Sequence, residues 1–116
     1  MSSWAQNPDF RVLNDSAEIE LLNFKGEVFQ MKKDVVYILF DGNSCEKCLN
    51  LNPLGDKEDF VFLTYWEGKI KNLGIQKKLS SKHQRSVFFT RSKVIFLKDD
   101  SFEFGKDIGP LYFKLW

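Results

Sequence analysis

Cys45 and Cys48 form a CxxC motif, the pair of residues in this chain best spaced for covalent chemistry. A redox dithiol should follow a strand and open a helix, because the helix N-terminus lowers the pKa of the first thiol. A strand is predicted before this motif, but Pro53 prevents a helix from continuing after it. As zinc ligands the pair supplies two of the usual four, so that site would have to be shared between subunits. We interpret the cysteines as small hairpin residues, with the redox and shared-metal roles as alternatives.

His83 is the single histidine, and it lies in a polar, basic stretch expected to be exposed to solvent. No nucleophile signature surrounds it. The carboxylates gather at predicted turns, where Asp is an ordinary turn residue, and the glycines do not form a phosphate-binding loop. The sequence therefore predicts a protein that is not an enzyme, with no assembled catalytic centre, no cofactor and no metal.

The charges are distributed unevenly along the chain. Residues 1–67 contain 12 acidic and 6 basic residues, whereas residues 68–98 contain 9 basic residues and no acidic one. If this carboxylate-free segment folds into one surface, that surface attracts phosphate chains, and release of their counterions supplies affinity. Aromatic residues that could stack on bases lie in or beside it: Tyr65, Trp66, Phe88, Phe89 and Phe96. The alternative is a solvated strand face above an aromatic core.

Length and composition predict a single domain. The chain has 116 residues, of which 43% are hydrophobic and 16% aromatic, enough to fill one small core. We expect one domain over residues 1–116, with residues 1–15 as a candidate flexible N-terminal arm. No apolar run reaches the roughly 20 residues of a membrane span. The first nine residues lack the features of a secretory signal, so a nuclear or cytoplasmic location is expected.

Period-two hydrophobic patterns predict an all-β or β-dominated chain. Alternation over 22–28 indicates a half-buried strand, and the apolar run 35–40 indicates a strand covered on both faces. Further strands are expected at 45–51, 59–71 and 86–98, with a short return at 101–104 and a long loop over 72–84. Residues 110–116 are predicted to close the core as a last strand, or to present an aromatic patch to a partner. Five or six strands at this spacing favour a small barrel or sandwich over a βαβ unit.

The segment FKGEVFQMKKDVVYILFDGNSCEKCLNL, residues 24–51, resembles the first three strands of an oligonucleotide/oligosaccharide-binding (OB) fold. Lys25-Gly26-Glu27-Val28 matches the glycine-containing first strand of that family, and Asp41-Gly42 matches the turn after its second strand. Gly26 would allow a strand shared by both halves of the barrel to bend. The resemblance extends weakly over residues 20–104. Pro53 and Gly55 stand where the family usually has a helix. A pleckstrin-homology-like barrel is the alternative architecture.

The resemblance implies binding of single-stranded DNA or RNA, or a supporting role in a complex that does so, with a larger protein as a further partner. Transferred to this chain, the family's binding surface includes Tyr37, Leu39, Lys47, Lys77, Lys78 and Arg85. The charge pattern adds the remaining candidates for phosphate contact: Lys69, Lys71, Lys82, Arg91 and Lys93. The alternative function is a protein-interaction module without nucleic-acid contact, built on a sheet edge or on the C-terminal aromatic residues.

Overall fold

The computed structural model of the chain describes residues 11–14, 19–41, 59–106 and 111–115. Within these ranges it contains nine strands and one helix, so the chain is β-dominated, as its sequence predicts. In chain order the elements are β1 (Arg11–Val12), β2 (Leu21–Leu22), β3 (Val28–Phe29), β4 (Val36–Leu39), β5 (Phe60–Tyr65), α1 (Lys69–His83), β6 (Val87–Thr90), β7 (Val94–Phe96), β8 (Ser101–Glu103) and β9 (Leu111–Lys114).

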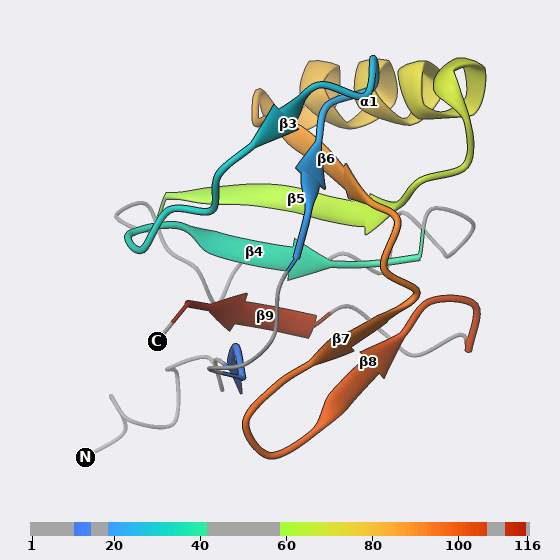
Figure 1. The fold of residues 1–116 in the computed structure, drawn as a ribbon. Coiled ribbons are helices and arrows are strands. Elements are labelled where there is room, and N and C mark those ends of the chain that lie inside the picture. The colour runs from blue at the N-terminus through green and yellow to red at the C-terminus, as the bar shows by residue number, and fades with distance from the viewer. Residues whose placement is uncertain (1–10, 15–18, 42–58, 107–110, 116) are drawn as a thin grey trace.

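Seven strands form one mixed sheet in the order β1-β9-β4-β5-β6-β2-β3, and β7 and β8 form a separate hairpin (Figure 1). The three central strands β4, β5 and β6 run parallel, with β9 and β2 antiparallel on either side. The sheet ends at β1 and β3, and among the described strands no pairing joins these two edges. The prediction of a closed barrel with five or six strands is therefore wrong.

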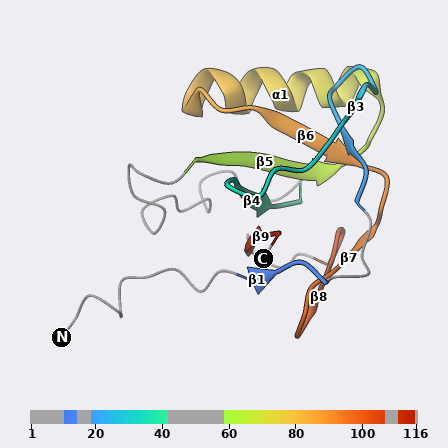
Figure 2. The ribbon, with the colours of Figure 1, turned by 60° about the vertical axis from the view of Figure 1, so that its left-hand side comes forward.

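Helix α1 connects β5 to β6 and covers one face of the sheet, while the β7–β8 hairpin lies on the opposite face (Figure 2). The predicted loop over 72–84, and the preference against a βαβ unit, are therefore wrong. Parallel neighbours need a crossover connection of a dozen or more residues, and a helix satisfies the backbone hydrogen bonds of such a crossover. The helix ends where Gln84 adopts a left-handed conformation, and the Gln84 N–H donates a hydrogen bond to the Ser80 carbonyl oxygen at 2.8 Å.

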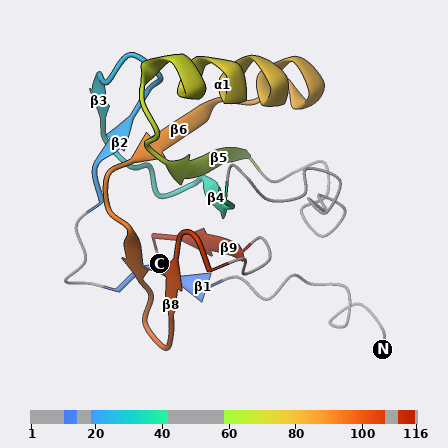
Figure 3. The same ribbon diagram turned by 90° about the vertical axis from the view of Figure 1, so that its right-hand side faces the viewer.

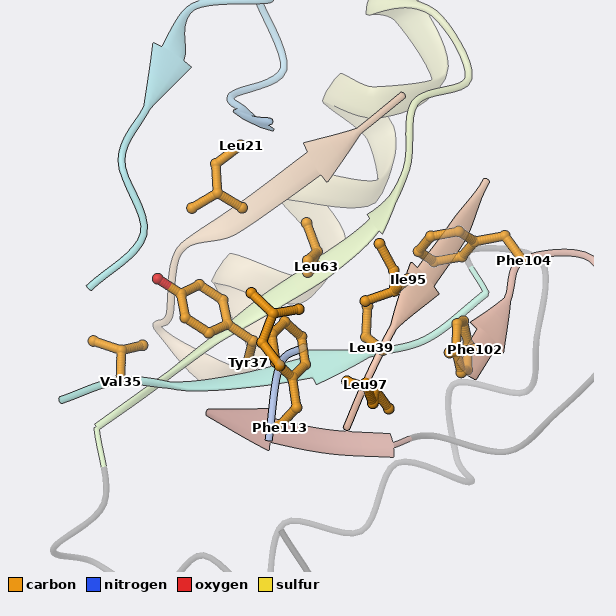
Figure 4. Close-up of a cluster of buried hydrophobic side chains, with 11 residues drawn as sticks. Leu21, Val35, Tyr37, Leu39, Leu63, Ile95, Leu97, Phe102, Phe104 and Phe113 are labelled. Atoms are coloured by element: carbon orange, nitrogen blue, oxygen red, sulfur yellow. The ribbon is translucent and has the colours of Figure 1, made fainter. Parts of the chain in front are cut away.

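Two hydrophobic clusters fill the two sides of the sheet. Residues of odd number on β4 and β5 pack against the β7–β8 hairpin and Phe113, whereas residues of even number pack beneath α1 (Figure 4). All four residues of β4 are buried, which confirms that the run 35–40 is covered on both faces. Strand β5 is divided in the same way, with Leu63 on one side and Phe62 on the other.

The predicted strand over 22–28 is interrupted by a turn. The Asn23 side-chain oxygen accepts hydrogen bonds from the backbone N–H groups of Lys25 and Glu27, each at 2.9 Å. These bonds hold the chain in the tight connection between β2 and β3, where Gly26 has a φ of +93°. Gly26 therefore allows a tight turn between two strands and does not bend a single barrel strand.

The predicted strand over 86–98 is divided between two sheets. After β6 the backbone N–H of Ser92 donates to the Thr90 hydroxyl oxygen at 3.1 Å, and the chain turns away from the main sheet into β7. The predicted short return is confirmed as β8, and the closing strand is confirmed as β9, which pairs with β4. Within the proposed N-terminal arm, Arg11–Val12 form β1 beside β9. The predicted strand over 45–51 lies outside the described residues.

Candidate nucleic-acid interface

Helix α1 gathers five of the predicted phosphate-binding lysines on one element. Its 15 residues include no carboxylate, and all five lysine side chains are exposed. They are Lys69, Lys71, Lys77, Lys78 and Lys82. The helix lies along the outside of the sheet, on the face opposite the β7–β8 hairpin (Figure 3). These five exposed lysines therefore lie on a helix, where the sequence predicts strand and loop.

The two sides of α1 differ in character. Asn72 and Leu79 are fully or almost fully buried against the sheet. The outermost position near the start of the helix belongs to Ile70, whose side chain is 90% exposed. At 100° per residue, Lys71, Lys78 and Lys82 follow one flank of the exposed side, because they are spaced by seven and four residues. The lysines therefore flank the exposed surface of α1.

The first turn of α1 adds to the positive potential. It contains Lys69 and Lys71, no acidic residue and no side-chain cap, since Gly68 occupies the N-cap position. The amino end of a helix carries a partial positive charge, and lysines at this end make it more positive. This arrangement is unfavourable for the isolated helix and attractive to an anion at the surface.

Arg85 and Arg91 lie in contact with acidic residues from other segments. An Arg85 guanidinium nitrogen lies 2.8 Å from a carboxylate oxygen of Asp59, and the corresponding distance from Arg91 to Glu20 is 3.4 Å. Arg85 also lies over the ring of Phe60, at 4.5 Å from the ring centre. These ion pairs reduce the positive charge that the two arginines present to a ligand. They belong to the connections around the sheet, whereas the five lysines belong to α1.

The remaining basic residues of the 68–98 segment lie away from α1. Lys93 precedes β7, and Lys98 lies in the turn between β7 and β8, on the opposite face of the sheet. The predicted single surface over 68–98 is therefore divided into a helical part, two ion-paired arginines and a hairpin part. The hairpin part also holds the acidic residues Asp99 and Asp100.

Tyr37 and Leu39 do not belong to an exposed binding surface. The Tyr37 side chain is only 2% exposed, and its ring stacks on Phe113 with 5.3 Å between ring centres. Leu39 is completely buried. Strand β4 occupies the middle of the sheet with both faces covered, so neither side chain belongs to the exposed strand surface that the resemblance implies. Lys47 lies outside the described residues.

Most of the predicted stacking rings lie in the core or pack against it. Phe89 is completely buried, and Trp66 meets it edge to face at 6.3 Å between ring centres. Phe96 is 58% exposed, but it lies on β7, on the side opposite α1. Phe29 is not among the stacking rings predicted from the sequence, yet its ring is 45% exposed on edge strand β3. The alternation over 22–28 predicts a half-buried strand that ends at Val28, so Phe29 falls outside the pattern.

The other candidates for chemistry receive no structural support. His83 is the last residue of α1 and is half buried, with its ring 5.3 Å from that of Phe62, so the prediction of an exposed loop histidine is wrong. Cys45 and Cys48 lie outside the described residues. Among the residues that the structure describes, no three His, Cys, Asp or Glu side chains are grouped to hold a metal ion. Nor does the described part include a helix long and apolar enough to cross a membrane.

Comparison of the chain with protein-family models, with curated proteins and with solved structures gave no match.

Proposed function

We propose that this protein is a non-catalytic domain that binds single-stranded nucleic acid, or supports a complex that does so, through phosphate contacts made by helix α1. The observation that carries the proposal is the set of five exposed lysines on a 15-residue helix without a carboxylate. Phosphate groups follow one another along a nucleic-acid strand, and a row of ammonium groups on one element can contact several of them. Each contact releases a counterion, which favours binding at low salt.

The preference for a single strand is supported by Phe29. This ring projects partly into solvent from strand β3, and unpaired bases stack on such rings whatever their sequence. A duplex does not offer its base faces for stacking. Phosphate contact alone serves both forms, so strand and duplex must be compared directly.

The test replaces Lys69, Lys71 and Lys77 with glutamine and measures the affinity for a labelled single strand over a range of salt concentrations. The matched control replaces Lys93, Lys98 and Lys106 with glutamine. These changes remove the same amount of charge near the β7–β8 hairpin. If each helix lysine contacts one phosphate, the slope of log K against log salt should fall by roughly 2 for the helix variant, at about 0.7 per contact. The control variant should keep the slope of the unmodified protein.

An equal loss in the two triple variants would show that only net charge matters, and it would contradict an interface on α1. Absence of binding at low salt to both single strands and duplexes would end the nucleic-acid proposal.

A second candidate function follows from the edge of the sheet. Val28 and Phe29 on β3 are 66% and 45% exposed, and among the described strands β3 pairs with β2 alone. An exposed edge with apolar side chains can accept a strand from a partner protein. Binding of that kind would depend little on ionic strength and would be lost in a Val28→Lys variant that retains its lysine helix.

A further inference from the structure

A half-open pocket of about 380 Å³ lies between strand β3 and the amino ends of the parallel strands. Its lining includes the apolar residues Leu21, Val35 and Phe88 and the charged residues Lys32, Asp59 and Arg85. This volume is near the lower end of the roughly 300–1,000 Å³ typical of small-ligand pockets. The pocket therefore suits a ligand of one or two rings.

The Tyr37 hydroxyl is a hydrogen-bond donor placed in this pocket. Its oxygen accepts a hydrogen bond from the backbone N–H of Lys32 at 2.7 Å. The hydroxyl hydrogen has no protein acceptor among the described residues, although the side chain is only 2% exposed. Figure 4 shows the hydroxyl directed away from Phe113 and into the space between Leu21 and Val35. A buried donor in this position favours a ligand with an acceptor atom.

Two aromatic rings also line the pocket. Phe29 and Phe88 both line it, with 5.5 Å between their ring centres and 60° between their planes. Phe29 is the more exposed of the two and lies on a two-residue edge strand, so its ring can adjust to a ligand. Rings in this arrangement offer both a face and an edge to a flat ligand.

The pocket also adjoins the end of α1. Gln84, Arg85 and Ser86 line it and directly follow the last residue of the helix. A nucleic-acid strand whose phosphates contact the α1 lysines could thus place one of its bases at the pocket.

We propose that this pocket binds a planar heteroaromatic ring with an acceptor atom at its edge, a ring of the nucleobase class. Tyr37 donates a hydrogen bond to the acceptor atom, and Phe29 and Phe88 contact the ring. The ring can come from a free nucleoside or from an unpaired base of a strand, and the second source depends on the proposed function. Binding of the free nucleoside does not depend on it.

The experiment titrates the protein with adenosine and with uridine, using ribose as the probe without a base, and follows the aromatic and amide NMR signals. We expect shifts centred on Tyr37, Phe29 and Phe88 with at least one nucleoside and none with ribose. Tyr37→Phe should weaken binding by about tenfold, because it removes one hydrogen bond from a buried donor. Phe29→Ala should also weaken binding, whereas Phe96→Ala, which removes an exposed ring on the opposite side, should not.

A second set of titrations identifies the source of the ring. A short oligonucleotide should bind more tightly than the same oligonucleotide with abasic sites if a strand base enters the pocket. Equal binding of the two, with nucleoside binding retained, restricts the pocket to free ligands. Loss of strand binding in the helix lysine variant without loss of nucleoside binding separates the pocket from the phosphate interface. Absence of any pocket shift with both nucleosides at millimolar concentration overturns the inference.

Discussion

Gly26 lies against the ring of Trp66. A Cβ atom added at Gly26 would be 3.4 Å from Cη2 of Trp66, and the Gly26 backbone has a φ of +93°. The turn between β2 and β3 is thereby placed over the residue that follows β5. A glycine that resembles a barrel motif in the sequence thus has a different role in the structure, as the point where a turn approaches the end of a central strand.

We predict that Gly26→Ala lowers the free energy of unfolding by about 1–2 kcal/mol, because an L residue is strained at this φ. Gly74→Ala is the matched control, because Gly74 lies inside α1 and an added Cβ would meet nothing within 4 Å. This second change should raise the free energy of unfolding by about 0.5–1 kcal/mol through helix propensity. Urea denaturation of the two variants measures both effects. A neutral Gly26→Ala variant would contradict the turn described here.

Replacement by valine should change the stability of the protein in opposite directions at two buried threonines on neighbouring strands. Thr64 and Thr90 are 1% and 0% exposed. The Thr64 hydroxyl has no hydrogen-bond partner among the described residues, whereas the Thr90 hydroxyl accepts the Ser92 N–H. Thr64→Val should therefore stabilise the protein by about 1 kcal/mol, and Thr90→Val should destabilise it by about 1 kcal/mol. Thermal unfolding of the two variants gives the comparison, and a loss of stability in Thr64→Val would reveal a partner for its hydroxyl.

The central strands could be predicted from the sequence because their signals are local. The run 35–40 contains only apolar or aromatic residues, and the alternation over 60–65 divides β5 between the two hydrophobic clusters. Helix α1 could not be predicted in this way. Its inner side includes Asn72, Gln76 and His83 among the apolar residues, and Gly74 interrupts it, so neither composition nor capping marks a helix. The parallel pairing of β5 with β6 explains the helix, and that pairing is a long-range property.

The candidate site was predictable only in part, for a related reason. The absence of carboxylates over 68–98 identifies the lysines of α1, but it cannot show that Arg85 meets Asp59 or that Arg91 meets Glu20. Those contacts join segments 26 and 71 residues apart. Tyr37 was assigned to the surface by resemblance, and its burial follows from the position of β4 inside a wide sheet.

The ion pair between Arg85 and Asp59 is predicted to contribute little to stability, because both side chains are substantially exposed. A double-mutant cycle with Arg85→Gln and Asp59→Asn should give a coupling energy of at most about 1 kcal/mol, decreasing with added salt. The Arg85→Gln change alone should cost somewhat more, because it also removes the contact with the Phe60 ring. Equal costs for Arg85→Gln and Asp59→Asn would show that this ring contact is without effect.

Stability should decrease in alkaline solution through two tyrosines. Burial raises the pKa of Tyr37 and of Tyr112 above the ordinary value of 10.0, and for Tyr37 the hydrogen bond from Lys32 opposes the shift without cancelling it. The folded protein thus favours the neutral phenol. This contribution to stability is fully present below pH 10.0 and is lost as the pH rises from there through the folded pKa.

The measurement is the free energy of unfolding in urea as a function of pH, together with absorbance of the tyrosinate form in the folded protein. Tyr37→Phe should make the alkaline decrease shallower, because phenylalanine does not ionise in either state. Ionisation of Tyr37 at or below its ordinary pKa would contradict its burial in the hydrophobic cluster that includes Phe113.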